Sequence, residues 1–192
     1  VKANSATATY DGKEHEAVGV ETYEFTVEGN SYTVSGLSTE DPKQKDAGSY
    51  TNNITGTPVV TDKEGNVVTS EFEVKTENGS LEIGKAAVTL KSATLSKKYD
   101  GNALVNGDTA LEVESGFAEG EGATYNFTGS QTVVGSSANA FSYELNSNTN
   151  IDNYAISKQE GTLTVTNREA KYEITVKANS ATATYDGKEH EA

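Results

Sequence analysis

The chain has 192 residues with no Cys, Met or Trp, and its 29 acidic and 15 basic side chains give a formal charge of −14. Without cysteine it can form no disulfide, thiol nucleophile or thiolate metal site, and its negative charge repels nucleic acid. No apolar run approaches the roughly 20 residues of a membrane-spanning helix, so we expect no membrane insertion.

In chain order, strands with one buried face are predicted where apolar and polar residues alternate. The segments with this alternation are 23–27, 72–74, 81–83, 141–145 and 163–165. Abundant threonine, and Tyr outnumbering Phe by ten to five, also favour β structure. Helix signals are poor, and only the segment 38–46 could hold one short helical turn.

Tight turns are predicted where Gly follows Asp or Asn, because these residues tolerate positive φ. Asn78-Gly79 lies between two alternating runs and predicts a hairpin, and Gly161 holds the matching place later in the chain. Three Tyr-Asp-Gly motifs each end an alternating run. Their residues are Tyr10, Asp11 and Gly12; Tyr99, Asp100 and Gly101; and Tyr185, Asp186 and Gly187.

The chain also repeats itself. Residues 1–17 (VKANSATATYDGKEHEA) recur letter for letter at 176–192, 175 positions later. We therefore expect a tandem array of near-identical periods. Because the chain starts at Val without a basic, apolar leader, we expect it to be part of a longer protein.

Each period has two related halves. The Tyr10 motif matches the Tyr99 motif, with a lysine eight residues before each, and the segment 72–83 parallels 154–165. This correspondence predicts two homologous domains, 1–84 and 85–167, followed by the first strand of a further repeat at 168–192. We expect all-β, Ig-like or sandwich-style domains joined by a short linker in an elongated rod. The alternative is a β-grasp-like domain with one short helix.

Several motifs together resemble a known group of proteins. The segments ATYDGKEHEA, KKYDGNAL, GEGATYNFTGSQTVVGSS and NYAISKQEGTLTV are similar to YDG-type and MBG-type repeats. These repeats occur in large, wall-anchored, adhesin-like surface proteins of Gram-positive bacteria. The resemblance implies an extracellular stalk or spacer that carries a distal binding region away from the cell wall. Neighbouring repeats of the same chain are then its partners, and weak multivalent binding of host mucin or glycans by each repeat is the alternative.

We expect no catalytic site. His15 has Leu104 at the matching place of the other half, so the two halves share no imidazole chemistry. We expect no cofactor, and calcium near Asp100 or Asp152 at a domain junction is the one cation kept open. Lys2, Lys91 and Lys177 share a position and are the candidates for Lys–Asn amide cross-links.

The segment 176–192 repeats a first strand without the rest of its domain. It is a spare edge strand, and unpaired edges invite pairing. We therefore expect it either to be disordered or to add to a neighbouring molecule.

Overall fold

The computed structural model describes residues 1–107 and 110–192 of the chain. Within these residues the structure is all β, as the sequence predicts, apart from two short 3₁₀ turns at Thr69–Glu71 and Ile151–Asn153. The described residues contain no α-helix, so the short helix of the β-grasp alternative is absent from them. The segment 38–46, whose sequence could hold one short helical turn, instead holds the end of β4 and the short strand β5.

The first half, residues 1–84, contains three small sheets with the strand orders β1-β8-β6, β3-β4-β7 and β2-β5. The β1–β8 pair is parallel and the other pairs are antiparallel. The strands are β1 (Ala6–Thr9), β2 (His15–Glu16), β3 (Glu24–Val27), β4 (Asn30–Thr39), β5 (Lys43–Gln44), β6 (Gly48–Asn52), β7 (Ile54–Asp62) and β8 (Gly79–Gly84).

The second half, residues 85–167, holds the sheets β12-β9-β17, β10-β18-β15, β13-β16 and β11-β14 among its described residues. Two pairs are parallel, β9 with β17 and β10 with β18. The strands are β9 (Ala86–Lys91), β10 (Leu95–Lys98), β11 (Leu104–Val105), β12 (Val113–Ser115), β13 (Ala123–Phe127), β14 (Ser130–Gln131), β15 (Gly135–Ala138), β16 (Phe141–Leu145), β17 (Tyr154–Gln159) and β18 (Thr162–Thr166).

Each half is organised around two extended stretches of chain that run side by side in the same direction. In the second half, β9 pairs with β17 and β10 pairs with β18 at one constant register, so the two stretches stay aligned over their whole length. In the first half β1 pairs with β8 in the same manner, with Ala6 opposite Leu81. We call each such pair of stretches a parallel ribbon.

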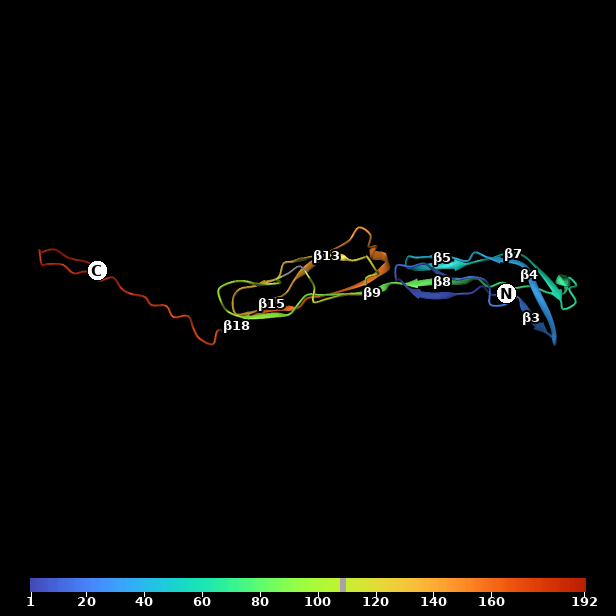
Figure 1. The fold of residues 1–192 in the computed structure, drawn as a ribbon, viewed down its shortest axis with the longest axis horizontal. Helices are drawn as coiled ribbons and strands as arrows, with labels where there is room; N and C mark the ends of the chain where they lie inside the picture. Colours follow the sequence, from blue (N-terminus) through green and yellow to red (C-terminus); the bar gives the residue numbers. More distant parts are fainter. Residues whose placement is uncertain (108–109) are drawn as a thin grey trace.

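The two ribbons are joined almost without a linker. Strand β8 ends at Gly84 and β9 begins at Ala86, so Lys85 alone separates them. Buried side chains of both strands belong to one hydrophobic cluster, which includes Leu81, Ile83 and Val88. In Figure 1 the two halves follow one another along the longest axis of the molecule.

The last residues, 168–192, form no strand and are exposed throughout. Figure 1 shows this segment continuing past β18, away from the folded body and at the opposite end from β3 and β4. Among the described residues, no helix has the length and apolarity to cross a membrane.

Candidate functional site

The three Asp-Gly motifs adopt the same local turn. The Oδ1 atom of Asp11 accepts a hydrogen bond from the backbone N–H of Lys13 at 2.9 Å, and Asp100 accepts one from the N–H of Asn102 at 2.9 Å. The following glycines, Gly12 and Gly101, have φ of 79° and 84°. An aspartate that bonds the backbone two residues later, followed by a left-handed glycine, defines a compact turn that needs no other partner.

Hydrogen bonding stabilises the ionised form of both aspartates. The pKa of Asp11 lies below its usual value because the carboxylate accepts the Lys13 N–H and also bonds the His15 ring. The pKa of Asp100 is lowered first by the Lys97 ammonium group, whose Nζ lies 2.7 Å from Oδ1. Carboxylates that accept such bonds favour the charged state.

The third motif forms this turn outside the folded body. Asp186 accepts the N–H of Lys188 at 3.0 Å, Gly187 has φ of 74°, and His190 lies 2.9 Å from the Asp186 carboxylate. Tyr185, before the turn, is 94% exposed. The turn is therefore encoded by its own few residues and not by the rest of the fold.

Gly79 and Gly161 do not form the hairpin turns that the sequence suggests. Neither has a positive φ, and Gly79 opens β8 while Gly161 connects β17 to β18. Both lie where the two stretches of a ribbon approach closely: a Cβ on Gly79 would be 2.1 Å from the Asn4 carbonyl oxygen, and one on Gly161 would be 2.2 Å from that of Ala93. The hairpin prediction is wrong at both positions, and close backbone approach is the reason for glycine.

Asn52 and Asn139 hold these two crossings together from equivalent places. Each side chain is fully buried. The Nδ2 group of Asn52 donates to the Asn4 carbonyl at 3.1 Å, and that of Asn139 donates to the Ala93 carbonyl at 2.9 Å. Each asparagine thus gives a partner to a backbone carbonyl that is partly withdrawn from water, so the asparagines are structural residues.

One predicted site residue, Tyr10, takes part in a network of hydrogen bonds where the two halves meet. Tyr10, 4% exposed, donates its hydroxyl to Glu121 at 2.5 Å, and Tyr154 donates to the other oxygen of Glu121 at 2.8 Å. The two rings pack edge to face, with centroids 5.3 Å apart, a favoured aromatic geometry. Burial first, and Glu121 second, raise the pKa of the Tyr10 hydroxyl.

A second polar contact joins the halves beside the first. Asn153, which is buried, accepts the Ala47 N–H at 2.8 Å and donates to the Asp46 carboxylate at 2.8 Å. Together with the Tyr10 cluster, this contact fixes one half against the other. We refer to Tyr10, Glu121, Tyr154, Asn153 and Asp46 as the junction cluster.

The sequence singled out Tyr10 but missed the other members of the junction cluster. Comparison of the halves could not find them, because the junction brings together different places of the two halves. Asn52 and Asn139, in contrast, occupy matching places on β6 and immediately after β15, and a full alignment of the halves would have revealed them.

Tyr99 lies at the far end of the second half, in the place that Tyr10 has in the first. Its N–H donates to the Thr166 carbonyl at 2.9 Å, as that of Tyr10 donates to Gly84 at 2.8 Å. Arg168 donates to the Tyr99 carbonyl and stacks over the ring of Tyr172 with 4.1 Å to the centroid. The three Tyr-Asp-Gly motifs are thus spread along the molecule and do not converge on one site.

The lysines considered for cross-links lie at the surface. The Nζ of Lys2 is 3.3 Å from Glu21 and that of Lys91 is 2.8 Å from Glu112, with each lysine side chain more than a third exposed. Lys177 lies in the exposed C-terminal segment. The ion-pair partners of Lys2 and Lys91 are thus surface carboxylates, which favours solvated lysines over amide cross-links.

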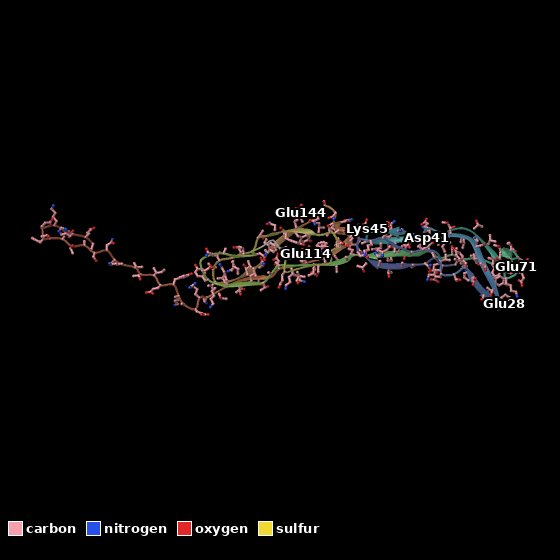
Figure 2. The ribbon with its side chains drawn as sticks, in the orientation of Figure 1. Glu28, Asp41, Lys45, Glu71, Glu114 and Glu144 are labelled. Atoms are coloured by element: carbon pink, nitrogen blue, oxygen red, sulfur yellow. The ribbon has the colours of Figure 1, made fainter. Side chains whose placement is uncertain are left out.

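Among the described residues, no group of three or more His, Asp or Glu side chains is placed to hold a metal ion. Figure 2 shows the labelled charged side chains lying apart from one another, from Glu28 and Glu71 at the far end of the first half to Glu114 and Glu144 in the second half. Comparisons with protein-family models, with curated proteins and with solved structures find no match for this chain.

Proposed function

We propose that the chain is a structural stalk or spacer repeat of a bacterial surface adhesin. In this proposal residues 1–84 and 85–167 are two tandem sandwich-style domains of an elongated, extracellular rod. The segment 168–192 opens the next repeat, and the rod carries a distal binding region away from the cell wall. The family resemblance of the Tyr-Asp-Gly segments and the duplication of residues 1–17 support this assignment.

The observation that carries the proposal is the parallel ribbon of each half. Because β1 and β8 are parallel neighbours, a pull along the chain enters at the N-terminal end of β1 and leaves at the C-terminal end of β8. These two ends lie at opposite ends of the pair, so the force loads the ladder of hydrogen bonds in shear. The bonds must then yield together instead of one after another, and this resists extension.

The connection between the halves suits the same role. A one-residue linker leaves no flexible tether to stretch, and the junction cluster holds the halves in one orientation. A stalk that carries a distal binding region away from the cell wall reaches further when its domains cannot bend against each other.

Mucin or glycan binding by the repeat itself is the alternative function. An exposed tyrosine ring of the Tyr-Asp-Gly motif could serve this function as a platform for stacking on sugar rings. In the first half this ring is enclosed by Glu121 and Tyr154. The geometry therefore favours a packing role for Tyr10 over a binding role.

Force spectroscopy on single molecules tests the mechanical proposal. The chain has no cysteine, so pairs of introduced cysteines define the pulling points. Pulling from residues 1 and 192 loads the ribbons in shear, and we expect unfolding forces several-fold higher than those for pulling between Lys2→Cys and Glu77→Cys. These two residues are parallel neighbours at one end of the first ribbon, so the second geometry peels its strands apart.

Equal unfolding forces in the two geometries would contradict the tension-bearing role. A mucin and glycan binding array on the same chain provides the second readout, and specific binding there would favour the alternative function.

A further inference from the structure

The first half has an apolar groove at the end remote from the second half. It is lined by Val1, by side chains of β3, β4 and β7 and by the extended segment 72–75, and it has a volume of about 180 Å³. Phe25, Val34, Val60, Phe72 and Val74 are among its walls. The backbone of residues 72–76 runs along the groove without belonging to any strand.

In the second half the corresponding place is occupied by a strand. Segment 72–77 matches 154–159, which is β17, and β17 pairs along its length with β9. The core of the second half includes three buried side chains of β9, namely Ala86, Val88 and Leu90. The first half has only the end of such a pairing, where Lys2 lies opposite Glu77 and the Val1 ammonium donates to the Lys75 carbonyl at 2.7 Å.

The C-terminal segment contains the strand that this groove lacks. Lys91, which ends β9, matches Lys2 and Lys177, so Tyr172, Ile174 and Val176 match the buried residues of β9. These three side chains alternate as a half-buried strand requires. In the structure they are 55%, 82% and 89% exposed.

We propose that a second copy of this chain docks its C-terminal segment into the first half by strand exchange. Its residues 176–185 take the place of residues 1–10, and its Tyr172 and Ile174 fill the groove ahead of them. Repeated at each end, the exchange joins molecules head to tail.

The exchange can restore the side-chain contacts that it replaces, because residues 176–185 have the same sequence as residues 1–10. The bond of the Val1 ammonium to the Lys75 carbonyl is the exception, since Val176 carries an amide N–H in its place. The exchange adds the burial of two apolar side chains and the pairing of a bare backbone edge, which is how an added strand gains affinity. A chain cannot supply its own groove, since β3, β4 and β7, which line the groove, lie at the opposite end of the molecule from the C-terminal segment (Figure 1). Within the array proposed above, one period would supply this segment to the next through the chain itself.

Sedimentation velocity on the full chain, equilibrated for days over a range of concentrations, tests the association. We expect oligomers that grow with concentration. Ile174→Asp should remain monomeric, and Ala170→Asp, which adds the same charge outside the strand, should associate like the unsubstituted chain. Both positions are in the exposed segment, so neither substitution can act by unfolding the body. A chain that is monomeric throughout, or an Ile174→Asp variant that associates equally, would overturn the proposal.

Peptide binding separates groove filling from simple strand replacement. The receptor is the full chain with Ile174→Asp, and the labelled probes are peptides of residues 171–185 and 176–185. The shorter peptide only replaces residues 1–10 by an identical copy, so we expect it to bind at least tenfold more weakly than the longer one. Equal affinities measured by fluorescence anisotropy would show that the groove contributes nothing and would refute the inference.

The expected register gives a further test. With Lys177 opposite Glu77, as Lys2 is now, Glu173 of the peptide lies beside Glu73 of the receptor. Like charges on neighbouring strands repel and opposite charges attract, so Glu73→Lys in the receptor should tighten binding of the longer peptide several-fold. Unchanged or weaker binding would rule out this register and with it the proposed exchange.

Discussion

Two glycines show how a single missing side chain permits the ribbon. At Gly79 and Gly161 one stretch of the ribbon passes so close to the other that a Cβ would overlap a carbonyl oxygen. Glycine is the residue that allows such an approach. The need for glycine at these places is therefore steric and independent of φ.

We expect Gly79→Ala to lower the free energy of unfolding by about 1–3 kcal/mol, the usual cost of overpacking a tight site. Gly84→Ala is the matched control on the same strand, because its Cβ would meet its nearest atom, the Ala8 carbonyl oxygen, at 3.7 Å. Urea unfolding of both variants measures the difference. Equal stabilities of the two variants would disprove the close approach at Gly79.

The Asp-Gly turns make stability depend on acid pH. The pKa values of Asp11 and Asp100 are lowered in the folded state, so the unfolded chain binds protons first as the pH falls. Their contribution is present above about pH 4, the ordinary aspartate pKa, and is lost as the pH drops through the folded-state value.

The Asp11→Asn, Asp100→Asn double variant should therefore lose less stability than the unsubstituted chain between about pH 4 and pH 2. Asp186→Asn is the control, because its turn lies outside the folded body and cannot affect its unfolding. Thermal unfolding at a series of pH values measures the dependence. A double variant with the same acid dependence as the unsubstituted chain would refute the role of these carboxylates.

At the scale of the strand, the buried asparagines set the register between a ribbon and its third strand. Asn52 stands opposite Gly79 in the β6–β8 pair and satisfies two backbone groups, the Asn4 carbonyl and the Asp41 N–H. An apolar residue of the same size could pack there but could not bond either group.

Asn52→Ala should reduce the free energy of unfolding by about 1–3 kcal/mol, because it leaves two partly buried backbone groups without their partner and an unpaired buried group costs about 1–3 kcal/mol. Asn126→Ala, at an exposed position of β13, should change it by less than about 0.5 kcal/mol. Calorimetry on the two variants gives the comparison, and a similar, small loss in both would contradict the structural role of Asn52.

Alternating apolar residues located many of the strands correctly. The runs at 81–83, 141–145 and 163–165 are β8, β16 and β18, because each of these strands has one buried face. The run at 72–74 has the same alternation but forms no strand. Alternation reports which face is apolar and does not report whether a partner strand is present, so this outcome could not be read from the pattern.

The hairpin predicted at Asn78-Gly79 does not form for a related reason. A local sequence cannot distinguish a chain that reverses from a chain that runs on and changes its partner strand. In this fold residues 72–84 continue in one direction, with the first part beside the groove and the second part in β8. Asn78 accepts a hydrogen bond from the Ile54 N–H, and Gly79 allows the close approach of Asn4. Both partners are far away in the sequence, so a rule for short turns does not describe them.

For the whole molecule, the junction cluster decides whether the halves behave as one body. Tyr10 and Glu121 are 111 positions apart in the chain and form one hydrogen bond with a charged acceptor. Bonds to charged groups contribute about 1.5–3 kcal/mol, so the pair couples the stability of the two halves.

A double-mutant cycle with Tyr10→Phe and Glu121→Gln measures this coupling. We expect an interaction energy of about 1–3 kcal/mol and, in the doubly substituted chain, separation of the single unfolding transition into two. Strictly additive effects with one unchanged transition would show that the halves are coupled elsewhere.

The linker at Lys85 has a geometric consequence. In β8 the core-facing residues have odd numbers, up to Ile83, and in β9 they have even numbers, from Ala86, since Gly84 and Lys85 are both exposed. Successive side chains of a strand point to opposite faces, so adding or deleting one residue turns over everything that follows. Insertions or deletions at Lys85 must therefore involve an even number of residues. A single inserted residue would turn the core-facing side chains of β9 to the opposite face of the strand.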